Sequence, residues 1–355
     1  MPGSVETMNG TELRFPPSKL ETLGQWTETG APVTGAVPLG ERVITAHGDG
    51  RLRLFAADGS VQVINAHDGV ILAMARETDA SVVTGGDDGR FLRVRGDGTV
   101  ELLADFGGAW VDSVAAHEQA GRVACSVGRS VHIWRTGVSH PERFEHPSTV
   151  GGIAFDPKGK RLAVAHYGGA TIWERGKRSW QQSKLAWAGS HIGVTWSPDG
   201  KFVVTIMQEN ALHGWRLRDR ADMQMSGYPA KPRAIDWVGN LPVLATSGAD
   251  QAIWWPFDSK SGPMDREPGR GASGGEQIVT AVRGLPGQPE VLAGFQDGAV
   301  LMSRTDDEAG DYVFRGSTGD EVTAIAVTES AMRFLVGDAA GKIFWVNLEA
   351  RYGQA

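Results

Sequence analysis

The chain has 355 residues, of which 41% are hydrophobic and 22% are charged, and its formal net charge at pH 7 is -7. This composition is ordinary for a globular protein, and the acidic balance argues against nucleic-acid binding. The single cysteine, Cys125, excludes an intrachain disulfide, and its apolar surroundings predict a buried thiol. The sequence contains no run of about 18 apolar residues, which would predict a membrane span. It also contains no basic segment followed by an apolar run, which would predict a signal peptide. We therefore expect a cytoplasmic protein.

The dominant feature of the sequence is a repeated hairpin. Early in the chain, "RVITAHGDGRLRLF" (residues 42–55) resembles "SVVTGGDDGRFLRV" (residues 81–94), which follows 39 residues later. Both halves of each stretch alternate apolar and polar residues around an Asp-Gly pair, which is typical of two strands joined by a tight turn. Similar stretches recur at residues 291–303 and 334–346. In the middle of the chain, "AFDPKGKRLAV" and "TWSPDGKFVVT" align with a shift of 41 residues.

Each repeat predicts four strands: an apolar first strand, a second strand after a Pro/Gly/Asp turn, a third strand after the hairpin, and a more polar fourth strand. An aromatic residue ends the third strand in most repeats, at Phe55, Trp134, Trp173, Trp215, Trp254 and Trp345. First strands are predicted to start near Val33, Val70, Val111, Val150, Ile192, Arg233, Ile278 and Val322. This gives eight repeats, and seven is the alternative if the first or the seventh is irregular.

The period of about 40 residues, the Asp-Gly turn and the aromatic residue at the end of the third strand resemble WD40 repeats over residues 33–355. The motifs are degenerate, because no repeat ends in Trp-Asp and the Asp-Gly pair persists fully only at Asp49, Asp88 and Asp297. The resemblance implies an all-β fold with a single β-propeller of four-stranded antiparallel blades.

The two ends of the chain predict how the ring closes. The last repeat, from Val322, supplies only three strands before the chain ends. We expect residues 19–29 to form its missing outer strand, which would remove an exposed sheet edge. Residues 1–18 are then an N-terminal tail and residues 19–355 one propeller domain. The stretch 258–275, rich in Gly, Pro and Ser, predicts a long loop with a poor fourth strand.

No catalytic signature is present: the sequence lacks Gly-x-Ser-x-Gly, a phosphate-binding loop, His-Glu-x-x-His and paired-cysteine metal sites. We therefore expect a protein that is not an enzyme and needs no cofactor, although some propellers are hydrolases. The resemblance implies a scaffold that presents a rigid rim to another protein or a peptide. We expect a monomer that binds neither nucleic acid nor membrane. The predicted rim residues are Trp110, His146, Lys231, Arg233, Asp320 and Glu321.

The histidines support an alternative function, a metal-binding or small-ligand protein. His47, His67, His166 and His191 map to one predicted face, and imidazole is a ligand for zinc, copper and nickel. The WD40 resemblance implies instead that His191 bonds Thr205 near Trp215, and that His67 bonds Thr84 and Asp88. We expect this structural role for His67 and His191 and leave His47 and His166 open.

Overall fold

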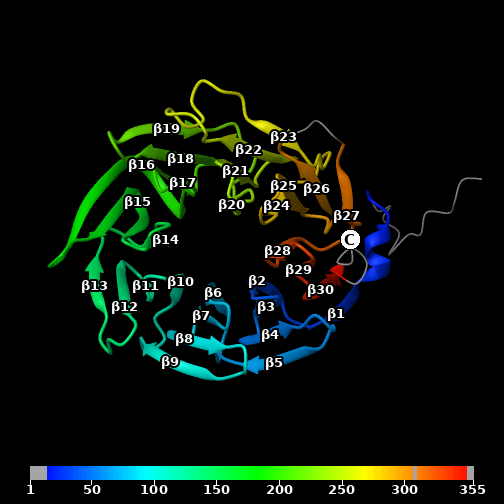
Figure 1. Ribbon diagram of the computed structural model, residues 1–355, viewed down its shortest axis with the longest axis horizontal. Helices are drawn as coiled ribbons and strands as arrows, with labels where there is room; N and C mark the ends of the chain where they lie inside the picture. The colour runs from blue at the N-terminus through cyan, green and yellow to red at the C-terminus, as the bar shows by residue number, and fades with distance from the viewer. Residues whose placement is uncertain (1–13, 307–309, 350–355) are drawn as a thin grey trace, which may run out of the picture.

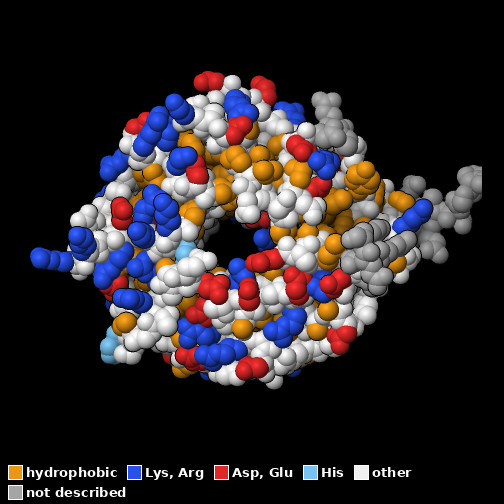
Figure 2. Space-filling model, viewed as in Figure 1, with side chains coloured by type: hydrophobic (Ala, Val, Ile, Leu, Met, Phe, Trp, Pro, Cys, Tyr) orange, Lys and Arg blue, Asp and Glu red, His pale blue; other side chains and the backbone are white. Residues whose placement is uncertain are grey.

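The computed structural model describes residues 14–306 and 310–349 and has the all-β propeller fold predicted from the sequence. Antiparallel sheets stand side by side in a ring around a central opening (Figures 1 and 2). Six of the sheets have four strands each. Two elements of that ring come from opposite ends of the chain, since β1 lies beside β30 (Figure 1).

The first three sheets follow the predicted four-strand order. Their strands are β2 (Val33–Leu39), β3 (Arg42–His47), β4 (Arg51–Phe55) and β5 (Val61–Asn65); β6 (Ile71–Thr78), β7 (Ser81–Gly86), β8 (Arg90–Arg95) and β9 (Val100–Asp105); and β10 (Val111–His117), β11 (Arg122–Val127), β12 (Ser130–Arg135) and β13 (Glu142–Glu145).

The remaining strands belong to the second half of the ring. They are β14 (Val150–Phe155), β15 (Arg161–Arg175), β16 (Trp180–Trp196), β17 (Phe202–Met207), β18 (Ala211–Arg216) and β19 (Ala221–Met225); β20 (Ile235–Trp237), β21 (Val243–Thr246), β22 (Ala252–Pro256) and β23 (Gly269–Gly271); β24 (Val279–Gly284), β25 (Glu290–Phe295), β26 (Val300–Arg304) and β27 (Tyr312–Arg315); and β28 (Val322–Val327), β29 (Arg333–Asp338) and β30 (Lys342–Asn347), which pair with β1 (Gln25–Glu28).

The strands form seven sheets, the number given as the alternative to eight. The sheet β14–β19 accounts for the difference, because β15 and β16 each occupy two strand positions. β15 folds back on itself, so that Arg175 N donates to Lys160 O (2.9 Å). β16 pairs with β15 up to Ser190 and with β17 from His191 onward. The prediction of eight separate blades is therefore corrected: the structure has seven sheets, and the sheet β14–β19 contains two consecutive repeats.

The repeated Asp-Gly turns form as the sequence predicts. In the β7–β8 hairpin, Gly89 has φ +81°, a left-handed conformation that glycine adopts without steric cost. Asp88 Oδ1 accepts a hydrogen bond from Arg90 N (3.0 Å) and so fixes the turn. Asp49 and Asp297 accept the equivalent bonds from Arg51 N and Ala299 N.

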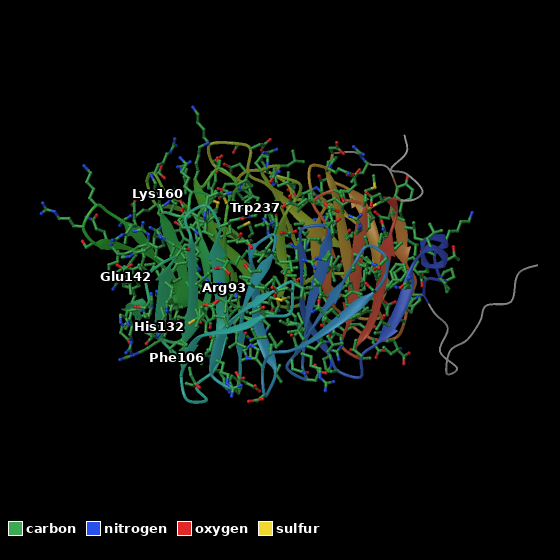
Figure 3. All side chains as sticks on the ribbon, turned by 60° about the horizontal axis from the view of Figure 1, so that its bottom comes forward. Arg93, Phe106, His132, Glu142, Lys160 and Trp237 are labelled. Atoms are coloured by element: carbon green, nitrogen blue, oxygen red, sulfur yellow. The ribbon has the colours of Figure 1, made fainter. Side chains whose placement is uncertain are left out.

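The ring has two faces. The turn face carries the turns between the first and second strands and between the third and fourth strands of each repeat. The junction face carries the turns between second and third strands. It also carries the connections from each fourth strand to the first, innermost strand of the next repeat. Lys160, in the turn before β15, and Phe106, directly after β9, lie at opposite edges of the ring in Figure 3. Figures 1 and 2 view the turn face.

The hydrophobic core lies between neighbouring sheets and, in the sheet β14–β19, between its two repeats. The predicted third-strand aromatic residues belong to it: Phe55, Trp134, Trp215, Trp254 and Trp345 are buried, and Trp173 is partly buried. Trp215 is 2% exposed. Cys125 is also buried, as predicted, and burial raises the pKa of its thiol.

The N-terminal segment closes the ring through a shorter strand than predicted. β1 covers only Gln25–Glu28, which pairs with β30 from Trp345 to Lys342. Lys19–Leu23 form a 3-10 helix, η1, instead of strand, because Ser18 N donates to Glu21 Oε1 (2.7 Å) and starts a helical turn. Residues 14–18 also contact the propeller, since Arg14 bonds Asp297. The predicted tail otherwise lies outside the described residues.

The predicted loop at 258–275 is present, and its fourth strand is the three-residue β23. β23 pairs with β22 only from Ala252 to Trp254. The helix η1 has five residues, and no described helix is long and apolar enough to cross a membrane.

Candidate binding surface

Trp110 is 62% exposed on the junction face. It follows Gly107 and Gly108, which have φ +66° and +85°, and the turn is held by Ala109 N donating to Phe106 O (3.3 Å). The next residue, Val111, is fully buried as the first residue of β10. The tight glycine turn and this anchor hold the indole at the surface, and its role in binding stays a prediction.

Tyr167 is the second exposed aromatic residue on the junction face, at 66%. It lies in the fold-back turn of β15, where Gly168 and Gly169 have φ +88° and +130°. Tyr167 N donates to Ser148 Oγ in the neighbouring connection (2.9 Å). The sequence analysis missed this residue, although an aromatic residue directly before Gly-Gly in "AHYGGA" is a usable signal for a solvent-facing turn.

The charged residues of the predicted rim form pairs. Arg233 bonds Glu321 (2.8 Å), although the two residues are 88 positions apart in the chain. Asp320 pairs with Lys342 (3.1 Å). Lys231 Nζ donates to Gln208 Oε1 (3.1 Å). The pairs of Arg233 and Lys231 join different repeats, whereas that of Asp320 lies within the last repeat. Exposed ion pairs of this kind contribute little stability.

His146, also predicted on the rim, is buried at 4% exposure, so the structure corrects this assignment. Trp173 Nε1 donates to His146 Nε2 (3.0 Å), and His146 Nδ1 bonds Arg129 O (3.2 Å). Burial lowers the pKa of His146 below its ordinary value. The imidazole thus links two repeats internally and is not available to a partner.

His67 and His191 have the predicted structural partners. His67 bonds Asp88 Oδ1 and Thr84 Oγ1, each at 2.9 Å. His191 Nδ1 bonds Thr205 Oγ1 (2.7 Å), and its ring lies 5.7 Å from Trp215. Its second nitrogen bonds Trp187 O (3.2 Å), whereas the second partner of His67 is the carboxylate of Asp88. Both nitrogens of each ring are therefore engaged by protein groups.

The two histidines left open are bonded in the same manner. His47 bonds Thr45 Oγ1 (2.8 Å) and lies near Ala31 O (3.4 Å). His166 bonds Thr171 Oγ1 and Tyr167 O, each at 2.9 Å. Within residues 14–306 and 310–349, no group of three or more His, Cys, Asp or Glu side chains has the arrangement of a metal site. The zinc alternative therefore gains no ligand set from these residues.

His213 was missed by the sequence analysis. It is fully buried on β18, stacks on Trp187 with ring centroids 3.9 Å apart, and contacts Trp215 edge-on at 4.7 Å. Neither ring nitrogen has a hydrogen-bond partner among the described residues, and Nε2 lies 3.8 Å from Asp222 Oδ2. Burial outweighs this carboxylate and lowers the pKa of His213 to about 4. The surrounding indoles enclose this imidazole, which is therefore a pH-sensitive part of the core.

The central opening is surrounded by the first strands of the repeats (Figure 1). A cavity of about 260 Å³ there is lined mainly by small and apolar residues of the inner strands. Its charged side chain, Arg283, donates to Ile325 O (3.1 Å) and pairs with Asp236 (3.4 Å). A larger cavity of about 800 Å³ lies on the turn face beside Phe202 and Phe257.

The comparisons define the class of protein through its fold. No protein-family model and no curated protein matches the sequence. Many solved structures match in three dimensions, among them a crystal structure of the computationally designed Ika8 protein. That match has a TM-score of 0.70 and 16% identity, and covers 90% of this chain and 97% of the other. The chain is thus a β-propeller, a fold that hosts many unrelated functions.

Proposed function

We propose that this β-propeller is a non-enzymatic scaffold, resembling WD40 proteins, that binds another protein or a peptide through its junction face. The observation that carries the proposal is the pair Trp110 and Tyr167, which are 62% and 66% exposed on that face. Large aromatic side chains are enriched among the residues that dominate binding energy in protein interfaces.

The rigidity of both positions supports this role. Trp110 directly precedes Val111, the buried first residue of β10, and Tyr167 is held by its backbone bond to Ser148. Side chains on a fixed backbone lose less conformational entropy on binding than those on a mobile loop. We further propose that the protein acts in the cytoplasm as a monomer, without a metal or another cofactor.

The test starts with a partner identified by co-purification from the native host and then purified. Calorimetric titration of that partner compares the wild type, the double variant Trp110→Ala/Tyr167→Ala and a control, Tyr312→Ala. Tyr312 is 60% exposed on the outer strand β27, so the control removes an equally exposed ring away from the junction face.

We expect the double variant to weaken binding about tenfold or more, as for hot-spot residues, and the control to change it less than twofold. Equal affinity of the wild type and the double variant would place the binding surface elsewhere. Turnover of a substrate by the purified protein would contradict the non-enzymatic role.

A further inference from the structure

Three arginine side chains converge on the turn face between the sheet β10–β13 and the repeat that follows it. Arg122 begins β11 and lies opposite Arg135 at the end of β12. Arg175 ends β15 in the next repeat. The guanidinium groups of Arg122 and Arg175 lie 5.1 and 5.9 Å from the ring of the same residue, Trp180. This arrangement brings cations from two repeats around one indole.

The cluster has more positive charge than its own carboxylate can balance. Glu142 pairs with Arg175 (3.4 Å) and accepts a hydrogen bond from Trp180 Nε1. Arg122 donates to Gly159 O, and its pKa is lowered by burial and by the charges of Arg175 and Arg135. Among the described residues, the exposed guanidinium of Arg135 has no hydrogen-bond or ion-pair partner.

The cluster lines a cavity of about 240 Å³. Its walls include all three arginines, the side chain of His140, and the apolar surface of Trp134 and Val138. The side chain of His140 is exposed and, like the guanidinium of Arg135, has no hydrogen-bond or ion-pair partner among the described residues. A planar guanidinium that is free to form a bidentate bond is suited to a carboxylate or phosphate.

The charge of the surrounding surface has the same sign. The segment 111–225 contains 15 of the 35 Lys and Arg residues of the chain but only 10 of its 42 Asp and Glu residues. Figure 2 shows Lys and Arg side chains gathered on the turn face over β12–β16. An anionic partner would therefore be attracted to this part of an otherwise acidic protein.

The groove continues beyond this cavity along walls that are mixed in polarity. They include the carboxylates of Glu77 and Glu101, which pair with Arg93 and Arg95. A second cavity of about 700 Å³, between β9 and β12, shares Trp134, Arg135 and Val138 with the first. Leu102 and Val138 on its walls are 57% and 51% exposed. Exposed aliphatic groups next to the unpaired guanidinium of Arg135 are suited to a ligand in which an acidic group neighbours an apolar one.

We propose that this turn-face groove binds an extended acidic segment of a partner protein. A carboxylate of the segment is held by Arg135 with Arg122 and Arg175, and an adjacent aliphatic side chain lies against Leu102 and Val138. The site is on the opposite face from Trp110 and Tyr167, so it provides the scaffold with a second, separate binding surface and does not depend on the first.

The test uses a fluorescein-labelled ten-residue peptide of alternating Leu and Glu, titrated with the full chain in low-salt buffer and followed by fluorescence anisotropy. The variant is Arg135→Ala, and the matched control is Arg143→Ala. Arg143 is 62% exposed on β13 and pairs with Glu145, so its loss changes the net charge equally outside the groove. Melting temperatures verify that both variants are folded.

We expect saturable binding that Arg135→Ala weakens about tenfold or more, as for loss of a charge-assisted hydrogen bond, and that Arg143→Ala changes less than twofold. A Leu-Gln peptide should bind at least tenfold more weakly, and Trp110→Ala should have no effect. Binding that is absent, unchanged by Arg135→Ala, or equal for the Leu-Gln peptide would overturn the proposal. Tighter binding of a single-stranded thymidine decanucleotide than of the peptide would overturn it too.

Discussion

The sheet β1/β28–β30 and the sheet β14–β19 reach similar packing by opposite routes. The first takes strands from both ends of the chain, and the bond between Thr29 and Gly341 spans 312 positions. The second forms from one continuous segment, in which each strand pairs with its neighbour in sequence. Both bury a tryptophan at the end of a third strand, Trp345 and Trp215, each 2% exposed.

This difference teaches that the repeat pattern specifies each sheet locally but does not by itself close the ring. Bringing together two segments that are far apart in the chain costs more conformational entropy than closing a local hairpin. In the closing sheet, that cost is offset by the short strand β1 and by packing of Trp26 on Phe344 (5.1 Å). The N-terminal segment is also anchored to the neighbouring sheet, where Arg14 bonds Asp297 in the β25–β26 turn. We therefore expect the closing sheet to be the more vulnerable of the two.

Deletion of residues 1–30 should have the largest effect. It removes β1 and the contact at Arg14, leaves the backbone of β30 as an open edge, and uncovers Phe344. We expect a loss of unfolding free energy on the order of 5 kcal/mol or more, or aggregation through the free edge. Thermal melting and light scattering measure this, with a chain lacking only residues 1–13 as the reference. Identical melting of the two truncated chains would show that β1 does not close the ring.

Trp215→Ala should have the next largest effect and tests the six-stranded sheet. Removing a fully packed aromatic side chain from a core typically costs about 3–5 kcal/mol. Urea denaturation measures the loss. Trp110→Ala is the matched control, because its ring is 62% exposed and surface substitutions usually change stability by less than about 0.5 kcal/mol. Equal losses in the two variants would refute the assignment of Trp110 to the surface.

The sequence predicted those features that depend on local pattern. Strand alternation, Asp-Gly turns and the spacing of aromatic residues placed the repeats, the core position of Trp215 and the bonds of His67. Features that depend on backbone continuity or on neighbouring repeats were not predicted. The merging of two repeats at β15 and β16, the burial of His146 by Trp173 and the convergence of Arg122 with Arg175 each require the three-dimensional packing of adjacent repeats.

Acid should weaken the six-stranded sheet through His213. Its pKa is about 4 in the folded protein and about 6.5 when unfolded, because burial disfavours the charged imidazole. The unfolded state therefore binds the proton more tightly, and stability present above pH 6.5 is lost as the pH falls toward 4. The loss amounts to about 3 kcal/mol at most.

The measurement is urea denaturation of the wild type and of His213→Phe between pH 7 and pH 4. Phenylalanine retains an aromatic ring beside Trp187 without a titrating group. The two proteins share every other histidine, including His47, whose pKa is also about 4, so the difference between them isolates His213. We expect the wild type to lose more stability than the variant as the pH falls. Parallel pH profiles would contradict this assignment.

Trp26→Ala should have the smallest effect, and it asks what in β1 closes the ring. Trp26 is 43% exposed, so its removal uncovers less apolar surface than the loss of Trp215. The substitution removes the ring contact of Trp26 with Phe344 and its cation–π contact with Arg315 at 5.7 Å, each of which contributes about 1 kcal/mol. We expect urea denaturation to show a loss of roughly 1–2 kcal/mol in the free energy of unfolding, because the backbone pairing of Gln25–Glu28 with β30 does not depend on this side chain.

A small loss of stability in Trp26→Ala, together with a large loss on deletion of residues 1–30, would show that the strand pairing and the anchor at Arg14 close the ring. If Trp26→Ala destabilised the protein as much as the deletion does, the closure would depend on this single indole.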